Sequence, residues 1–598
     1  MFDVAPTARL LARFAETGEL PAPPAGLAAG DVTRWFQRNK YPLLALAPLA
    51  PAWLADDPTF RRELAAERAW YETQRAEYVL ARAAWLEQGI DCLMIKSAGN
   101  APSFPHTSDN IDILFRREQA VAARETLRRL GYIELRNVEE PQKHLFRKFH
   151  DGRCVSAIHV HERVGWAVGF MDEAELWARL RPAADDPLVN VPSPEDAILI
   201  NLAHACYENK RLRLNDVARV RHVLRATEGR LDWAYLERVA AGNAWLEGLR
   251  FMLLAYAALE PALYGSALVP AAQQERCREG LRAAGFIERR LDDLRAAPAA
   301  DLPLDLSYWY CKRLYYRKVL RDPTRTPRQR WRDAGLTLLW GVKLKTGMRP
   351  QPGMIVALSG PDGSGKTAHA EALVGALRLC GLRTQYVWNR GGSTGLVGAA
   401  NALRRLPGRG DRAAAPECAD PLQRRRRHHP LARFAWAWLV AADQVGAYLL
   451  RARLPALCGR IVVADRYAYD TAVEMDLSLP PDARWSRLAI AAMLRLTPRP
   501  HRAYALDVSA ETARARKRDE PWHADFAAER RRYRDLAPRW GLRPLSTEGA
   551  FADSNDPLIR DVGMAFMADI ETWRNGLLLA NPSQLNPPDL AWARGGGR

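Results

Sequence analysis

The spacing of apolar residues alternates between helix and strand periods in the first part of the chain. Residues 65–89 place apolar side chains three and four positions apart, which predicts a helix ending at Gly89. Residues 117–131 predict a second helix that ends in the same way. Short apolar runs typical of strands lie at 90–95, 110–115, 132–136 and 154–161. This alternation predicts a small mixed α/β domain.

The pattern becomes helical from residue 193 onward. Ser193 begins the sequence SPED, where it is the predicted N-cap, with Pro194 in the first turn and Asp196 three positions on. Helical spacing then continues to about residue 346. The predicted organisation of this half is a helical segment at 1–65, an α/β domain at 66–190 and a helical region at 191–346.

The second half has a different character. The sequence RPQPG at 349–353 breaks the helical pattern, and we place the main domain boundary there. Buried strands are predicted at 354–359, in GRIVVADRYAYD (459–470) and in HRAYALDV (501–508), and helices separate them. This order predicts an α/β domain with a parallel sheet over residues 352–575, followed by a flexible tail at 576–598. Residues 403–430 have no apolar period and predict a mobile basic loop.

Charge narrows the choice of partner. The 598 residues carry a formal net charge of +18, most of it from Arg. An acidic partner such as a nucleotide phosphate, a nucleic acid or an anionic membrane surface would explain this charge, and so would solvated basic faces. Both interpretations stay open, because the Arg residues are spread along the chain. No nucleic-acid-binding motif accompanies them.

Cysteine spacing and hydropathy exclude further classes. None of the eight cysteines forms a CxxC pair, which excludes a zinc ribbon and argues against a disulfide framework. The most apolar segment, 434–450, carries Asp443 and Gln444 at its centre and is too short and polar to span a bilayer. The N-terminus lacks the apolar core of a signal peptide. We therefore expect a cytoplasmic protein that could form a homodimer.

The sequence GPDGSGKT at 360–367 follows one predicted strand and precedes a predicted helix. Its glycines let main-chain N–H groups approach phosphate oxygens without a Cβ in the way. Lys366 places a charge on the β and γ phosphates, and the Thr367 hydroxyl can bind Mg²⁺. Strand, loop and helix together predict nucleoside triphosphate binding. The residues assigned to it are Gly360, Asp362, Gly363, Ser364, Gly365, Lys366 and Thr367.

Two later segments supply candidate groups for phosphoryl transfer. Asp465 ends a predicted strand, where it could hold Mg²⁺ through water, and Arg466 could clamp an acceptor phosphate. The sequence ETARARKRDE places Arg514, Arg516 and Arg518 in one basic segment. A loose transition state spreads negative charge over equatorial oxygens, which Arg side chains on a closing lid would stabilise. Each of these three also fits an ordinary solvated charge.

These motifs resemble thymidylate kinase and its relatives over residues 353–575. The matching pieces are SGPDGSGKT, VWNRGG, DRY, and LDVSAETARARKR before a helix ending ERRRYRDLA. The resemblance implies a P-loop kinase fold with ATP and Mg²⁺ as cofactors. It implies that Asp362 meets the acceptor ribose and that Arg390 and Arg466 hold the acceptor monophosphate, with Tyr467 completing the DRY motif.

The base-reading positions depart from that family. The places of the stacking aromatic and of the hydrogen-bonding Arg are occupied by Val440 and Gln444. Stacking is lost at the first position, and a cation is replaced by an amide at the second. We therefore expect an acceptor other than thymidylate.

The first half resembles the bacterial nucleotidyltransferase family with LKG, DIDLLV and DLHW motifs, over about residues 66–260. The resemblance implies a mixed sheet followed by helices, with carboxylates that hold Mg²⁺ against a triphosphate. Of the D-x-D pair, Asp112 is present, its partner position is Asn110, and Asp109 lies one place earlier. The third carboxylate position holds His159, and His161 matches the family His. Imidazole and amide ligands hold Mg²⁺ poorly, so we expect a degenerate site, with Asp109 and Asp112 as the remaining metal ligands if it is active.

The leading functional interpretation is an ATP-dependent kinase of the nucleoside monophosphate type, fused to a degenerate nucleotidyltransferase-like domain. It would act on a phosphorylated small molecule. The alternatives are an ATP-binding regulator or scaffold without significant kinase activity, and an active nucleotidyltransferase that uses Asp109 and Asp112. Arginines on a lid favour the kinase over the scaffold, and the missing carboxylates count against the active nucleotidyltransferase.

Overall fold

The computed structural model separates the chain into two compact units. Unit 1 contains residues 1–148 and 155–348, and unit 2 contains residues 149–154 and 349–598. The residues that the structure describes are 6–20, 27–96, 103–104, 110–136, 143–166, 168–228, 230–285, 302–345, 352–389, 430–479, 483–516 and 526–576.

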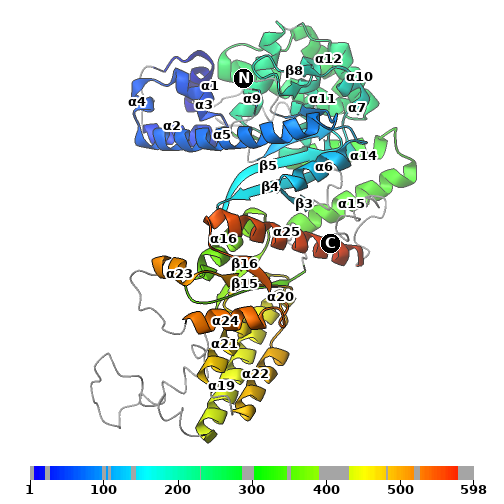
Figure 1. Ribbon diagram of the computed structural model, residues 1–598. Coiled ribbons are helices and arrows are strands. Elements are labelled where there is room, and N and C mark those ends of the chain that lie inside the picture. Colours follow the sequence, from blue (N-terminus) through cyan, green and yellow to red (C-terminus); the bar gives the residue numbers. More distant parts are fainter. Residues whose placement is uncertain are drawn as a thin grey trace, which may run out of the picture. The chain divides into compact units, whose positions relative to one another are not determined.

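Unit 1 contains a five-stranded mixed sheet with the strand order β1-β2-β5-β4-β3 (Figure 1). The β2 and β5 strands are parallel, whereas β1 pairs with β2, and β3 with β4, in antiparallel fashion. The strands are β1 (Cys92–Met94), β2 (Ile111–Phe115), β3 (Ile133–Arg136), β4 (Lys143–His150) and β5 (Arg153–His161). The prediction of a mixed sheet is confirmed. The sequence did not predict β4, because five of its eight residues are basic.

Two hydrophobic clusters cover the sheet of unit 1. On one face, Trp85 of α5 (Pro58–Leu86) and Leu127 of α6 (Ala120–Arg129) pack with Ile113 and Val160. On the other face, Leu114 joins the large cluster that the helical region contributes. Successive residues of a strand point to opposite faces of its sheet. The residues of β2 and β5 that alternate with Ile113 and Val160 therefore point toward the helical region.

The long helix α5 begins earlier than the sequence predicted. It starts at Pro58 rather than residue 65, and it crosses the predicted boundary between residues 65 and 66. The Asp57 carboxylate accepts hydrogen bonds from the N–H groups of Thr59 and Phe60, at 2.9 and 3.0 Å. This N-cap and the proline in the first turn fix the start, because both satisfy the unpaired end of the helix.

The chain after the sheet of unit 1 is mainly helical. The Ser193 hydroxyl accepts from the Asp196 N–H at 3.2 Å and donates to the Asp196 carboxylate at 2.7 Å, as an N-cap does. Short strands interrupt the helices as three two-stranded pairs: β6 (Gly165–Trp166) with β7 (Val168–Gly169), β8 (Arg181–Pro182) with β9 (Asn190–Val191), and β10 (Arg211–Leu212) with β11 (Leu304–Asp305). The remaining helices of unit 1 are α1 (Pro6–Thr17), α2 (Ala29–Arg38), α3 (Leu43–Leu46), α4 (Ala52–Ala55), α7 (Glu173–Ala178), α8 (Pro194–Ala203), the π-helix η2 (His204–Asn209), α9 (Leu214–Ala226), α10 (Trp233–Gly242), α11 (Leu246–Tyr264), α12 (Ala271–Ala283), α14 (Tyr308–Arg321) and α15 (Pro327–Lys345).

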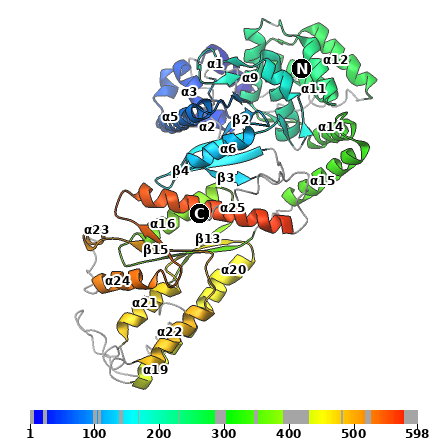
Figure 2. The ribbon, with the colours of Figure 1, turned by 45° about the vertical axis from the view of Figure 1, so that its right-hand side comes forward.

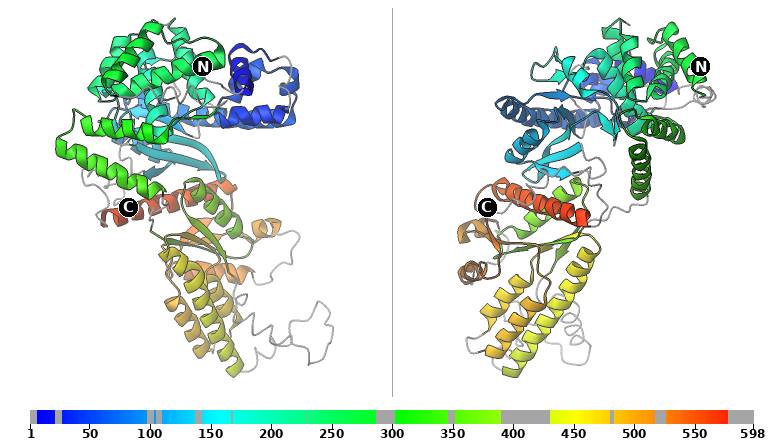
Figure 3. Two further views of the ribbon diagram at one scale, coloured as in Figure 1. Left: turned by 180° about the vertical axis from the view of Figure 1, so that it is seen from behind. Right: turned by 90° about the vertical axis from the view of Figure 1, so that its right-hand side faces the viewer.

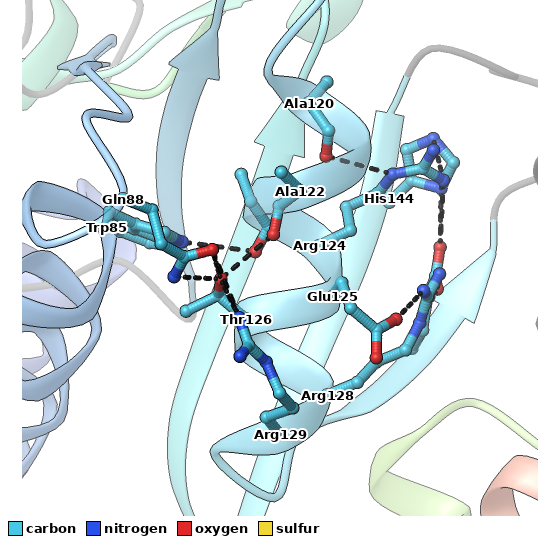
Figure 4. A network of polar contacts seen from close by, with 12 residues as sticks. Trp85, Gln88, Ala120, Ala122, Arg124, Glu125, Thr126, Arg128, Arg129 and His144 are labelled. Atoms are coloured by element: carbon cyan, nitrogen blue, oxygen red, sulfur yellow. Dashed lines mark hydrogen bonds and ion pairs between the residues drawn. The ribbon is translucent and has the colours of Figure 1, made fainter.

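A buried ionic network ties the β3–β4 hairpin to α6 (Figure 4). The Glu134 carboxylate lies 2.9 Å from His144 Nδ1 and 2.9 Å from Arg128 Nε, and Arg124 Nη1 lies 3.4 Å from it. Burial by itself would raise the pKa of Glu134, but His144 and the two guanidinium groups hold it well below its usual range. The charged form of Glu134 therefore holds this edge of the sheet against its helix.

Unit 2 contains a five-stranded sheet in which every pair is parallel, with the order β13-β14-β12-β15-β16. The prediction of a parallel sheet is confirmed. The predicted strand at 354–359 is β12, which lies at the centre and has every residue buried. The strands are β12 (Met354–Ser359), β13 (Thr384–Trp388), β14 (Ile461–Asp465), β15 (Arg502–Asp507) and β16 (Arg543–Ser546).

Helices cover both faces of this sheet (Figures 1 and 2). One face carries α16 (Lys366–Leu379) and α25 (Phe551–Gly576). The other carries α19 (Pro430–Tyr448), the π-helix η3 (Leu449–Arg453), α20 (Leu454–Leu457), α21 (Ala468–Ser478), α22 (Arg484–Leu496) and α24 (Phe526–Leu536). The short helix α23 (Ala510–Arg516) follows β15. Among the described helices, none is long and apolar enough to cross a membrane. The mobile loop predicted at 403–430 lies, except for its last residue, outside the described residues, as does the tail after Gly576.

Candidate functional site

In unit 2, the turn from β12 to α16 is a tight glycine-rich loop. Gly360 and Gly365 have φ angles of +157° and +83°. A Cβ at Gly360 would lie 2.4 Å from the main-chain oxygen of Leu506 in β15, so no other residue fits there. The loop leads directly into α16, so its main-chain N–H groups lie at the N-terminus of that helix. The helix dipole favours a bound anion at this end.

Lys366 is folded over its own loop. Its Nζ donates to the carbonyl oxygens of Gly360 and Pro361, at 2.7 and 2.8 Å. Burial lowers the pKa of Lys366. The loop also contains Ser364, whose buried hydroxyl has no hydrogen-bond partner within the described parts of the chain. A bound phosphate would supply charged acceptor oxygens to the Lys366 ammonium and to the Ser364 hydroxyl. The carbonyl oxygens that Lys366 contacts in this structure are neutral and therefore weaker acceptors.

Asp465 lies at the carboxyl end of β14, beside Leu358 of the central strand. Its Oδ2 accepts from the Thr367 hydroxyl at 2.6 Å and from the Tyr386 hydroxyl at 2.8 Å. Its Oδ1 is buried and has no partner among the described residues. A hydroxyl and a carboxylate with a free lone pair are hard oxygen donors, which fit Mg²⁺. The structure thus brings together the two residues that the sequence assigned to the metal.

Arg466 points back toward the loop from the end of β14. Its Nη2 lies 3.0 Å from Asp362 Oδ1, so the two predicted acceptor residues form an ion pair. Burial opposes its charge, but Asp470, Asp362 and Glu474 raise the pKa of Arg466. Its φ of +73° is unusual for a residue with a side chain. Such backbone strain clusters at functional sites, where the surrounding structure holds it in place.

Asp470 was not predicted, yet it connects the loop to the segment after β14. Its carboxylate accepts from the Ser359 hydroxyl at 2.6 Å and from the Tyr533 hydroxyl at 2.8 Å. It also accepts from the N–H groups of Gly360 and Tyr467, at 3.3 and 2.7 Å. The DRYAYD sequence contained this signal, because Asp470 is the N3 residue of α21 and caps that helix.

Tyr467 does not take the position expected of an acceptor ligand. Its ring packs in the hydrophobic cluster below the sheet, 4.3 Å from the ring centre of Tyr448. Its hydroxyl donates to the main-chain oxygen of Pro498 at 2.5 Å. The Tyr467 side chain is therefore directed into the core.

The two base-reading positions on α19 differ in their surroundings. Val440 packs in an aliphatic cluster with Ala472 and Met475. Gln444 is fully buried, and its Oε1 accepts from Asn389 Nδ2 at 3.0 Å at the end of β13. Asn389 Oδ1 and Gln444 Nε2 have no partner in the described structure. When two side-chain amides share one hydrogen bond, one of them keeps an unused NH₂ donor and the other keeps an unused oxygen acceptor. This holds for either assignment of the amide oxygen and nitrogen atoms. Arg390, one residue further, lies outside the described residues.

The predicted lid arginines are only partly described. Arg514 and Arg516 lie on α23, and Arg518 is outside the described residues. Arg516 donates to the main-chain oxygen of Thr547 at 2.5 Å, and the Thr547 hydroxyl donates to the main-chain oxygen of Ser364 at 3.1 Å. Arg516 is thereby held next to the loop.

Glu529 on α24 is a further group near the loop that the sequence did not predict. Burial raises the pKa of Glu529, and the carboxylates of Asp470 and Asp362 raise it further, to about 7, although Lys366 opposes the shift. A carboxyl group with this pKa changes its charge near neutral pH. The negative charge of a phosphate bound at the loop would favour the protonated form of Glu529 further.

In unit 1, three predicted residues meet on the face of β2 and β5. His161 Nε2 and His159 Nδ1 lie 2.8 and 3.2 Å from Asp112 Oδ1. One potential ligand atom from each of the three residues lies within 4.8 Å of the others. Burial lowers the pKa of His161 to about 3, so this imidazole is neutral. Asn110 Nδ2 lies 2.6 Å from His159 Nδ1, and Asp109 falls outside the described residues.

A lysine shares the only described carboxylate of this triad. Lys96 Nζ lies 3.2 Å from Asp112 Oδ1 and 3.3 Å from Glu208 Oε2. Burial would raise the pKa of Asp112, but Lys96 and the two imidazoles hold it well below its usual range. This set does not fit Mg²⁺, which prefers several hard oxygen ligands in octahedral geometry. The Asp112 carboxylate is instead neutralised by the protein itself.

A comparison with protein families finds a match for part of unit 1. Residues 50–260 match a family model described as an uncharacterised nucleotidyltransferase. The match supports the nucleotidyltransferase part predicted for the N-terminal half, and with it a transferase-type domain. No curated protein matches the chain.

Proposed function

We propose that unit 2 is an ATP-dependent phosphotransferase of the nucleoside monophosphate kinase type, and that it acts on a phosphorylated small molecule. The observation that carries the proposal is the buried, unpartnered Oδ1 of Asp465 beside Thr367, at the loop that holds Lys366. A buried carboxylate oxygen costs free energy unless it is paired, so the site is built for a ligand that supplies the partner.

Each residue has a distinct task in this proposal. The loop amides and Lys366 hold the β and γ phosphates, and Lys366 exchanges its two carbonyl contacts for phosphate oxygens. Thr367 and Asp465 would hold Mg²⁺, whose charge offsets that of the phosphates. Arg466 orients the acceptor phosphate for in-line attack on the γ phosphorus, and Asp362 holds Arg466 in place. Arg514 and Arg516 stabilise the charge on the equatorial oxygens.

A screen of acceptors with labelled ATP tests this proposal. The purified full-length chain is incubated with nucleoside monophosphates and sugar phosphates, and transfer of the γ-phosphoryl group is measured. We expect transfer to at least one acceptor, lost in Asp465→Asn, with thymidylate a poor substrate because Val440 offers no ring for stacking. A high specificity constant for thymidylate alone would contradict the expected change of acceptor. Absence of transfer to every acceptor, with ATP still bound, would favour a regulator or scaffold.

For unit 1 we infer a domain that binds or scaffolds and has lost nucleotidyl transfer. The support is the Asp112 carboxylate, which is neutralised by Lys96 and flanked by imidazoles where Mg²⁺ requires carboxylates. The alternative, an active nucleotidyltransferase that uses Asp109 and Asp112, is consistent with the family match over residues 50–260.

A transfer assay on a kinase-deficient chain separates the two. The Lys366→Ala chain is supplied with α-labelled nucleoside triphosphates and either Mg²⁺ or Mn²⁺. We expect no release of pyrophosphate and no labelled product, with Asp112→Asn behaving identically. Label transfer that requires Asp112 would establish the active enzyme.

A further inference from the structure

The exposed side of α19 in unit 2 is apolar throughout. Between Pro430 and Leu450, every exposed residue with a described side chain is apolar. We call the large ones among them, together with one residue of α20, the α19 stripe: Leu431, Phe434, Trp438, Leu439, Leu449, Leu450 and Leu457. Leu431 is 72% exposed and Leu450 is 68% exposed. Leu431, Phe434 and Trp438 follow one another at spacings of three and four residues, so they lie on one face of α19.

The opposite side of the same helix is already used by the fold. Ala437, Val440 and Ala441 pack in the cluster with α21 and α22, and Tyr448 packs below the sheet. A helix that is hydrophobic on all sides is normally covered on all sides. An exposed apolar face of this length marks an interaction surface rather than a solvated one.

The exposed charged residues of α19, η3, α20 and α22 are basic, as far as the structure describes these helices. Arg451 and Arg453 lie on η3 between Leu450 and Leu457 of the stripe, and Arg484, Arg487 and Arg495 are exposed on the adjoining α22. In α19, η3, α20 and α22, as far as the structure describes them, Asp443 is the sole carboxylate, and it is buried. The helix pair extends away from the parallel sheet, as the yellow and gold helices of Figure 3 show.

We propose that the α19 stripe docks on an anionic lipid bilayer, with the helix lying in the plane of the interface. Leu, Phe and Trp side chains enter the boundary between headgroups and acyl chains, and the flanking arginines contact lipid phosphates. A second copy of the chain fits less well, because a symmetric contact would bring arginines of the same surface together. A nucleic acid would pair with the arginines but leave the apolar stripe in water. This inference is independent of the acceptor proposed for the loop.

Vesicle sedimentation of the full-length chain tests the proposal. We expect the protein to pellet with vesicles of phosphatidylcholine and phosphatidylglycerol, and to stay in solution with phosphatidylcholine alone. Leu450→Glu should weaken partitioning into the vesicles about tenfold or more. It removes a leucine that would enter the bilayer and adds a negative charge that the anionic lipids repel. Leu379→Glu is the matched control, since Leu379 is 52% exposed on α16 and lies outside the stripe. The pair Arg451→Gln and Arg453→Gln should weaken binding in the same direction.

Two results would overturn the proposal. One is a parent chain that does not pellet with the anionic vesicles. The other is a lipid-free dimer in sedimentation velocity that Leu450→Glu disperses and Leu379→Glu does not, which would assign the stripe to a second copy. Leu450 is exposed, so its substitution leaves the core intact, and an unchanged melting temperature checks this.

Discussion

Replacing Lys366 with alanine is expected to abolish stabilisation of unit 2 by ATP and to remove phosphoryl transfer. The side chain is buried in the loop and donates to two main-chain oxygens that a triphosphate would replace as acceptors. At about one hundred times its dissociation constant, a ligand stabilises the folded state by about 2.7 kcal/mol. For a domain of this size that corresponds to a rise of about 5–10 °C in the melting temperature, which the variant should lack.

The control for this experiment lies on the same helix. Arg378→Ala removes a cation from the last turn of α16, where the side chain is exposed and its Nε donates to the Thr384 hydroxyl at 3.2 Å. Differential scanning fluorimetry with a non-hydrolysable ATP analogue should show the full shift for Arg378→Ala and none for Lys366→Ala. If the Lys366→Ala chain is stabilised as much as the parent, nucleotide binding does not occur at this loop.

The parallel sheet of unit 2 could be predicted because its signals are local. The first five residues of β12 form an unbroken apolar run, and a glycine-rich turn and a helix follow soon after. The short distance from Asp465 to Thr367 also follows from local patterns, since parallel strands end at one edge of their sheet. Each of these inferences rests only on a strand and on the residues that end or directly follow it.

The parts that could not be predicted depend on contacts between distant segments. Glu134 makes β4 stable by pairing with His144, which turns a basic sequence into a strand with a buried edge. The capping position of Asp470 is local, but its contacts with hydroxyl groups on β12 and α24 are not. In unit 1, Lys96 neutralises Asp112 and also contacts Glu208, which is 112 positions away in the sequence. No local pattern encodes these pairs, because burial decides which charges meet.

Replacing Arg466 with alanine should reduce turnover far more than ATP affinity. Arg466 lies at the end of β14, paired with Asp362 and raised in pKa by three carboxylates, so it keeps its charge at any working pH. Losing a charge-assisted hydrogen bond to a reacting phosphoryl group costs about 2–4 kcal/mol in the barrier, which is a decrease of about 30- to 1000-fold in kcat. The ATP-dependent shift in melting temperature should remain, because Lys366, Thr367 and the loop amides are unchanged.

The contrast between two arginine variants makes this expectation specific. Arg466→Lys keeps the charge but loses the planar fork that binds a phosphate through two parallel hydrogen bonds, so it should recover only part of the activity. Arg539→Ala removes an exposed arginine of unit 2 from outside the loop region and should match the parent in kcat and KM. Steady-state kinetics with the best acceptor from the screen measures all three variants. A rise in the KM for ATP equal to the loss in kcat/KM for the acceptor would move Arg466 to the donor side of the site, where it would hold the γ phosphate instead.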